Sequence, residues 1–226
     1  MLLLYFIAAG VIVGRLRGGR LSALASVRFR WWGLALAGLG FQLVLFSRPV
    51  AERVGDAGPA LYVASSLAVF VAMLRNLGLP GFPLIAIGAA LNLTVIVANG
   101  GYMPSSPDAW LQLTGLAALP TTGYSNSALI GAVTPLPFLG DIFVLPRPLP
   151  FANVFSVGDV LIGVGAAWCL VRSMTVTAAG RGADDGKVAG GPARVAADPG
   201  KVAAGGPARV AADPGKVAAD PSVRAR

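Results

Sequence analysis

The chain has 226 residues, of which 55% are hydrophobic and 12% are charged, with a formal net charge of +8. About a quarter of the residues of a soluble domain are charged, so this composition excludes an ordinary soluble domain and indicates a membrane protein. Histidine is absent, which excludes histidine-dependent serine or cysteine catalysis and imidazole-bound zinc or haem. Cys169 is the only cysteine, so no internal disulfide can form.

Five apolar stretches predict membrane-spanning helices, because a span needs about 20 predominantly apolar residues. The predicted spans cover residues 1–17, 31–47, 59–75, 80–98 and 151–172. The first span is short, and it reaches the headgroups only if Arg15 and Arg17 snorkel. Its arginines follow the apolar run, whereas a cleaved signal peptide carries its positive charges before that run, so we expect this segment to stay as a helix.

Basic residues are divided unequally between the two ends of the predicted helices. The segments after the first, third and fifth spans hold 15 Lys and Arg residues, and those after the second and fourth spans hold 3. The excess of Lys and Arg marks the cytoplasmic side, which predicts an external N-terminus and a cytoplasmic C-terminus. Because the bases are scattered over separate connections, they form no single soluble basic face, and we expect no nucleic-acid partner.

Residues 99–150, between the fourth and fifth spans, have eight prolines but only three charges, so they are neither a solvated loop nor a further regular span. We expect them to form an apolar cap on the outer ends of the helices. Ser106, Pro107 and Asp108 predict a helix start, and that helix would run to about Leu119. A second short helix is compatible with residues 127–133, and the prolines from 135 to 150 favour extended chain.

The sequence allows two positions for the start of the helix in the fifth predicted span. Ser156 and Asp159 have the spacing of a capping box, which would begin the helix near Val157 and make Asp159 a structural residue of its first turn. A start at Phe151 would instead carry Asp159 about two turns into the membrane, where an ionisable residue is a functional candidate. We favour the cap, because such caps are common and acids inside spans are rare.

Polar and small residues inside the spans indicate where helices meet. Gln42 and Asn92 lie within the second and fourth spans, and each is expected to hydrogen-bond to another helix. Small residues four apart allow close approach of two helices in lipid. Such pairs are Gly33 with Ala37, Ala86 with Ala90, and Gly163 with Ala167.

Residues 173–226 form a low-complexity tail that contains a repeat rich in Gly, Ala and Pro and no aromatic residue. Such a composition cannot bury a core, so the tail is predicted to be disordered. Its bases are interleaved with acids, which favours a tolerated terminal extension over a lipid-binding segment.

Six motifs in residues 1–172 occur in a recognisable order. They are Gly18-Gly-Arg-Leu21, Arg28-Phe-Arg-Trp-Trp32, Gln42, Asn99-Gly-Gly-Tyr-Met-Pro104, Gly140-Asp141 and Phe155-Ser-Val-Gly-Asp-Val-Leu-Ile162. On these motifs the chain resembles the DUF5317 family of bacterial membrane proteins. The resemblance implies a multi-pass protein of the bacterial plasma membrane, and it brings no established activity, substrate or catalytic residues. The tail lies outside it.

The sequence therefore predicts an all-α membrane protein with about five spans, an external cap and a disordered tail. Its candidate polar cluster consists of Asn99, Tyr102, Asp141, Arg147, Ser156 and Asp159. No catalytic, cofactor-binding or metal-binding residues and no cofactor are predicted. The leading hypothesis is a structural or interaction protein whose partners are the lipid bilayer and another membrane protein or a second copy.

Two alternatives stay open: a translocator of small solutes or ions that uses Asp141, Arg147 and Asp159, and a membrane enzyme acting on lipid or envelope substrates. A water-accessible route to Gln42 and Asn92 would favour translocation, and convergence of Asp141 and Asp159 on one cleft would favour an enzyme. We expect Arg147 to pair with Asp141 or Asp159, and such pairing alone would favour the structural hypothesis.

Overall fold

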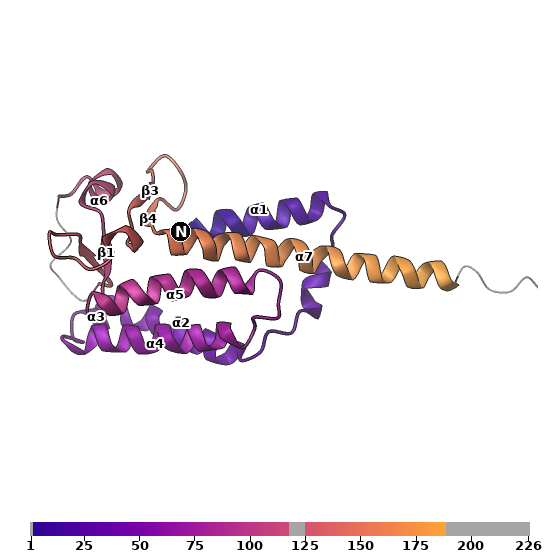
Figure 1. Ribbon diagram of the computed structural model, residues 1–226, viewed down its shortest axis with the longest axis horizontal. Helices are drawn as coiled ribbons and strands as arrows, with labels where there is room; N and C mark the ends of the chain where they lie inside the picture. Colours follow the sequence, from indigo (N-terminus) through magenta and orange to yellow (C-terminus); the bar gives the residue numbers. More distant parts are fainter. Residues whose placement is uncertain (1, 118–124, 189–226) are drawn as a thin grey trace, which may run out of the picture. The chain divides into compact units, whose positions relative to one another are not determined.

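The computed structural model describes residues 2–117 and 125–188, and it is mostly helical (Figure 1). Five long helices carry most of this part of the chain: α1 (Leu2–Leu16), α2 (Trp32–Leu45), α4 (Ala57–Leu74), α5 (Phe82–Ala98) and α7 (Val157–Val188). The first four begin and end within two residues of the predicted spans, whereas α7 begins six residues after the start of the predicted span 151–172 and extends beyond its end. Two segments, Ala57–Leu74 and Val157–Thr175, are long and apolar enough to cross a membrane, and α1, α2 and α5 are shorter apolar helices.

Shorter elements connect these helices. They are the 3-10 turn η1 (Leu21–Ser26), helix α3 (Arg48–Ala51), strand β1 (Met103–Ser105), helix α6 (Pro107–Thr114), strand β2 (Ser127–Leu129), the 3-10 turn η2 (Pro137–Leu139), strand β3 (Phe143–Leu145) and strand β4 (Asn153–Phe155). Strand β1 pairs with β2 in parallel, and β3 pairs with β4 in an antiparallel ladder. The strands and α6 lie together at one end of the long helices (Figure 1).

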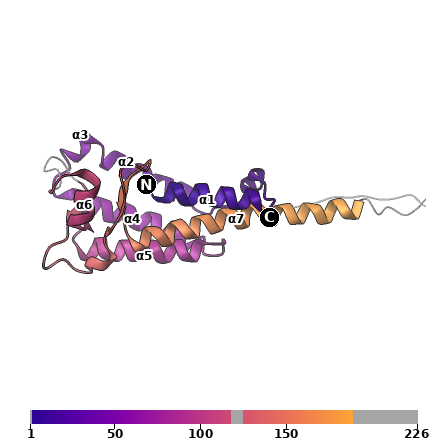
Figure 2. The ribbon, with the colours of Figure 1, turned by 90° about the horizontal axis from the view of Figure 1, so that it is seen from above.

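Helix α7 lies between α1 and α5 (Figure 1). It packs along α1 and along α5, while α5 also contacts α4, and α4 contacts α2. Figure 2 shows the same arrangement from above, with α1 running beside α7. Segments that are far apart in the sequence are therefore adjacent in the fold.

Facing glycines bring α5 and α7 into backbone contact. A Cβ atom at Gly81 would collide with the carbonyl oxygen of Gly165, and one at Gly88 would collide with that of Gly158. On each helix the two glycines are about two turns apart, so they lie along one face. None of the small-residue pairs noted in the sequence contains these four glycines.

The predicted small-residue pairs have different surroundings. Gly163 faces the Phe6 ring of α1, and the Ala167 Cα lies 2.8 Å from the position of a Cβ at Gly10, so this pair does mark a helix contact. Gly33 has no atom within 4 Å of its Cβ position, so its predicted role in close packing is wrong.

The connection from α5 to α7 differs from its predicted secondary structure. Helix α6 ends at Thr114 because Gly115 adopts the left-handed conformation with φ 75°, so the predicted extension to Leu119 is wrong. Residues 127–129 form strand β2, where a helix was considered. The extended conformation after residue 135 is interrupted by the turn η2. The predicted helix stop at Pro120 falls outside the described residues.

Helix α7 begins at Val157 and continues to Val188, so residues 173–188 are helical, contrary to their assignment to a disordered tail. The remainder of the predicted tail, residues 189–226, lies outside the described part of the chain.

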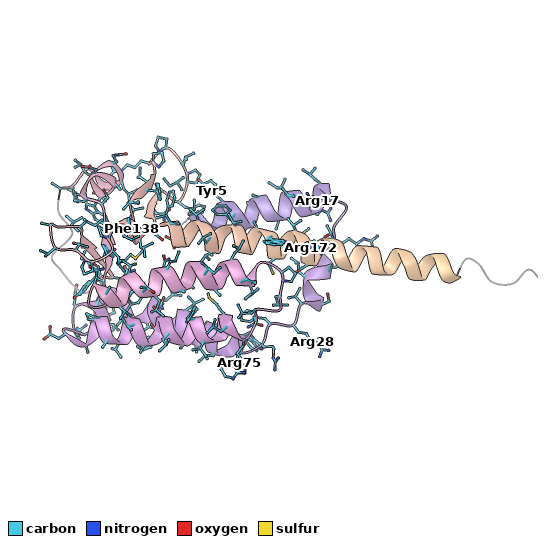
Figure 3. All side chains as sticks on the ribbon, viewed as in Figure 1. Tyr5, Arg17, Arg28, Arg75, Phe138 and Arg172 are labelled. Atoms are coloured by element: carbon cyan, nitrogen blue, oxygen red, sulfur yellow. The ribbon has the colours of Figure 1, made fainter. Side chains whose placement is uncertain are left out.

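Arginines gather at the ends of the helices away from the strands. Arg17, Arg28, Arg75 and Arg172 lie toward this end, whereas Phe138 lies at the strand end (Figure 3). Arg75, which follows α4, places its guanidinium carbon 4.5 Å from the centroid of the Trp31 ring. These four arginines and the Trp31 ring thus occur toward one end of the bundle.

Candidate functional site

A partly open cavity of about 240 Å³ lies among α2, α4, α5, α7 and the connection from α5 to α7. Its polar lining residues are Gln42, Tyr62, Ser66, Asn92, Asn126, Asp141 and Asp159. The two polar residues predicted inside spans therefore share one cavity with both candidate acids. The remaining lining is apolar and includes Phe70, Met73 and Leu93.

Asn92 joins α5 to the first turn of α7. Its Nδ2 donates to Asp159 Oδ1 at 2.9 Å, and its Oδ1 accepts a hydrogen bond from the Ser156 hydroxyl at 2.9 Å. Ser156 and Asp159 also cap α7, because the Asp159 amide donates to Ser156 Oγ at 3.1 Å and the Ser156 amide donates to Asp159 Oδ2 at 3.0 Å. The predicted cap is confirmed, and Asp159 also lines the cavity.

Further hydrogen bonds connect the polar residues of α2, α4 and the segment before β2. Gln42 Nε2 donates to Ser65 Oγ at 3.2 Å and to Ser66 Oγ at 3.1 Å. Asn126 Nδ2 donates to the Tyr62 hydroxyl at 3.3 Å. The prediction that Gln42 bonds to another helix is therefore confirmed.

Backbone hydrogen bonds fix the position of Asp141 beside β1. Its amide donates to the Pro104 carbonyl at 2.8 Å, and its carbonyl accepts from the Ser106 amide at 3.0 Å. No described residue donates a hydrogen bond to its carboxyl group. Burial, together with the charge of Asp159, raises the pKa of Asp141 from 3.8 to about 7. Asp141 is therefore poised to gain or lose a proton near neutral pH.

Ser105 carries a buried hydroxyl next to two cavity residues, Met103 and Asp141, although Ser105 does not itself line the cavity. Met103 and Ser105 are alternate residues of a strand, so their side chains leave the same face, and Met103 lines the cavity. Ser105 also forms a parallel bridge with the cavity residue Asp141. Its side chain is fully buried, yet Oγ has no hydrogen-bond partner among the described residues.

A comparison with protein-family models shows to which family the chain belongs. The model described as a family of unknown function, DUF5317, matches residues 26–171, which is more than half of the chain. The chain belongs to the DUF5317 family. The match starts after α1, later than the resemblance in the sequence, and it includes every residue that lines the cavity. No curated protein and no solved structure matches the chain.

Arg147 has a different role in this DUF5317 member from the one predicted. Its Nε donates to the Leu113 carbonyl at 2.5 Å, and Nη2 donates to the Thr114 carbonyl. These carbonyls end α6, where free acceptors and the helix dipole attract a cation. Within the described ranges the one ion pair joins Arg48 to Glu52, at 3.8 Å. The predicted pairing of Arg147 with Asp141 or Asp159 is therefore wrong.

Asn99 and Tyr102, the other members of the predicted cluster, lie outside the cavity lining. Asn99 Nδ2 donates to the Val95 carbonyl at 2.8 Å and to the Pro135 carbonyl at 3.0 Å, which joins the end of α5 to the segment before η2. The Tyr102 amide donates to the Asn99 carbonyl at 3.3 Å. Of the predicted cluster, Asp141 and Asp159 line the cavity and Ser156 supports Asp159.

Sequence reasoning did not single out Tyr62, Ser66 or Asn126 as site residues. Tyr62 and Ser66 are four residues apart in a helix whose only other polar residue is Ser65, so they share one helical face. The spacing of these two residues could have predicted that this face of the helix forms a polar wall of a site. Asn126 lies in a connection without periodicity, and only the packing of that connection brings it to Tyr62.

Proposed function

We propose that this DUF5317 member binds a small solute in the cavity among α2, α4, α5 and α7 and moves it across a membrane. The observation that carries the proposal is that Gln42, Asn92, Asp141 and Asp159 all line this one cavity. Pairing of Arg147 with an acid would have favoured the structural hypothesis, but Arg147 binds the end of α6 instead. Translocation is therefore the hypothesis that the contacts favour.

The proposal includes a multi-pass arrangement in a bacterial plasma membrane. Helices α1, α2, α4, α5 and α7 would each span, with the N-terminus and the segment 99–150 outside and the C-terminus in the cytoplasm. Support comes from the lengths of α4 and α7, from the apolar composition of the other three helices, and from the arginines at one end of the bundle. Lipid is the expected surrounding, and a second copy or another membrane protein is a further expected partner.

The size of the cavity restricts the solute. A volume of about 240 Å³ corresponds to about eight water molecules at roughly 30 Å³ each. Drug-sized ligands occupy pockets of about 300–1,000 Å³. We therefore infer a solute with fewer than about ten non-hydrogen atoms.

Osmotic swelling of proteoliposomes tests this proposal. The purified full-length chain is reconstituted, and light scattering follows the entry of small neutral, anionic and cationic solutes. We expect faster entry of at least one class than into protein-free liposomes. Replacing Ser66 with Phe should abolish that entry because the ring fills the cavity. Ala64→Phe, at an exposed position on the same helix, should leave it unchanged. No accelerated entry of any solute would overturn the proposal.

A membrane enzyme is the second candidate, because Asp141 and Asp159 line the same cavity as an acid and base pair could. The hydrogen bonds of Asp159 weigh against it. One carboxylate oxygen accepts from Asn92 and joins α5 to α7, and the other accepts from the Ser156 amide and caps α7, so both oxygens already have structural hydrogen bonds. We therefore rank catalysis below translocation.

A further inference from the structure

The cavity has acidic groups and no basic group among its lining residues. Asp141 and Asp159 both contribute, and every other lining side chain is uncharged. Arg147, the basic residue of the connection from α5 to α7, is bound to the carbonyls that end α6. An unpaired carboxylate in a poorly solvated site is unfavourable until a positive charge joins it. The charge of the site therefore favours a cationic solute and disfavours an anionic one.

Ser105 provides a second, independent indication of a ligand with hydrogen-bond donors. Its buried Oγ lies on the strand face shared with Met103 and Asp141 and has no partner among the described residues. Buried polar groups are nearly always hydrogen-bonded, and Ser105 borders the cavity residues Met103 and Asp141 without itself lining the cavity, so we infer that a donor bound at Asp141 would also satisfy this oxygen. An ammonium group has three donors and no acceptor, which suits a carboxylate and a hydroxyl together.

The apolar part of the lining distinguishes an organic cation from a bare metal ion. Phe70 and Met73 of α4 and Leu93 of α5 line the same cavity, and its volume is much larger than one ion requires. Aliphatic chain binds such a wall through apolar burial, and an aromatic ring can also contact the cation directly.

We propose that the solute is a small alkylammonium ion whose charged end lies at Asp141, Asp159 and Ser105 and whose alkyl chain contacts Phe70 and Met73. This inference rests on the proposed function of the same cavity and names its substrate class.

Proton release should accompany binding. The titratable groups that face Asp141 are Asp159 of α7 and Tyr62 of α4, while α5 and β1 carry no charged residue, and Asp108 of α6 is exposed outside the lining. Because the pKa of Asp141 lies at about 7, protonated Asp141 predominates at pH 5.5 and ionised Asp141 at pH 8.5. A cation that binds the ionised form displaces that proton to water. Affinity should therefore be about thirtyfold higher at pH 8.5 than at pH 5.5, in proportion to the ionised fraction of Asp141.

Thermal unfolding of the full-length chain in mild detergent tests the inference with four probes at matched ionic strength: n-butylammonium chloride, sodium butyrate, n-butanol and sodium chloride. We expect butylammonium alone to raise the unfolding temperature in a saturable way. An alkylamine resembles the lysine side chain, whose pKa is about 10.4, so the probe stays charged at both pH values. Tetrabutylammonium, which exceeds the cavity, should have no effect.

Two substitutions localise the effect. Asp141→Asn should lower the apparent affinity for butylammonium at least tenfold and remove its pH dependence, and Ser105→Ala should lower it a fewfold. Asp108→Asn removes an exposed acid from the same connection and should leave the affinity unchanged. If Asp141→Asn fails to fold, the comparison of the four probes with the unmodified chain still decides the question.

Absence of a butylammonium effect, or an equal effect of butanol or butyrate, would overturn the cation inference. The translocation proposal would fall separately, through the swelling assay. Entry of a neutral solute there, with no butylammonium binding, would keep translocation and reject the cation. Saturable butylammonium binding without entry of any solute would support the cation site and reject translocation.

Discussion

At the scale of single residues, two acids of one cavity differ in their hydrogen bonds. Asp159 accepts from Asn92 Nδ2 and from the Ser156 amide, whereas no described residue donates to the carboxyl group of Asp141. Burial of a carboxyl group without hydrogen-bond donors favours its protonated form, as at Asp141. Two chemically identical side chains therefore differ in their surroundings, since Asp159 is held by structural hydrogen bonds and Asp141 is not.

The first prediction concerns the pH dependence of stability. The folded chain holds Asp141 with a pKa of about 7, above its ordinary value of 3.8, so the folded state binds more protons between these pH values. This residue's contribution to the free energy of unfolding should therefore decrease as pH rises from about 4 to 7. Unfolding of Asp141→Asn in detergent should lack this component, and the variant should be more stable than the unmodified chain at pH 8. Identical pH profiles would contradict the prediction.

The second prediction concerns Asn92, which binds both capping residues of α7. Asn92→Ala should lower the free energy of unfolding by about 1–3 kcal/mol, because it leaves Asp159 Oδ1 and the Ser156 hydroxyl without these partners. Thr94→Ala is the matched control, since this exposed side chain of the same helix only returns a hydrogen bond to Ala90. Denaturant unfolding in mixed micelles gives both values. Equal losses for the two variants would show that the Asn92 contacts contribute little.

At the scale of elements, the contact between α5 and α7 determines where the acids lie. Facing glycines, Gly81 with Gly165 and Gly88 with Gly158, allow the two backbones to touch. This approach brings Asn92 within hydrogen-bond distance of Ser156 and Asp159. One wall of the cavity therefore depends on the absence of side chains at four positions.

The third prediction is that Gly88→Ala separates these helices. The added Cβ meets the Gly158 carbonyl oxygen, which belongs to backbone and cannot rotate away, so the free energy of unfolding should fall by about 1–3 kcal/mol. Gly40→Ala on α2 adds its Cβ where no atom lies within 4 Å, and it should be neutral or stabilising by up to about 1 kcal/mol. Thermal unfolding of both variants in detergent checks the contrast. A loss at Gly40 as large as that at Gly88 would contradict it.

At the scale of the whole molecule, the lengths of the helices and the positions of the arginines bear separately on how the chain lies in a membrane. Two helices satisfy the length of a span, and three apolar helices are shorter. The arginines labelled in Figure 3 lie away from the strands, which agrees with a bundle whose basic end faces one compartment. The proposed membrane orientation rests on this separation of charge.

The fourth prediction is the orientation itself. In a Cys169→Ala background, an impermeant thiol reagent applied to intact cells should label Asp108→Cys and spare Ala25→Cys. Both positions are exposed in the structure, so accessibility within the protein does not separate them. Labelling after cell lysis provides the control for reactivity at residue 25. The reverse pattern in intact cells would overturn the proposed orientation.

Local patterns were enough to place the long helices and one cap. Apolar runs of sufficient length located α1, α2, α4, α5 and α7 to within a few residues at most ends, because burial and backbone hydrogen bonding depend on neighbouring residues. The start of α7 followed from Ser156 and Asp159, which lie three residues apart and bind each other's amides. The family followed from short motifs, all but the first of which lie within the matched residues 26–171.

Contacts between distant segments decided the site. The partner of Arg147 is the end of α6 because that end is fixed by Gly115, a termination that the helix pattern to Leu119 did not reveal. The meeting of Asn92 with Asp159, and of Tyr62 with Asn126, joins residues more than sixty positions apart. No periodicity encodes such pairs, since they arise from the backbone contact of α5 with α7 and from the folding of the cap segment onto α4. The local sequence predicted where the helices lie, whereas the packing of the helices and the cap segment brought Asp141 and Asp159 into one cavity.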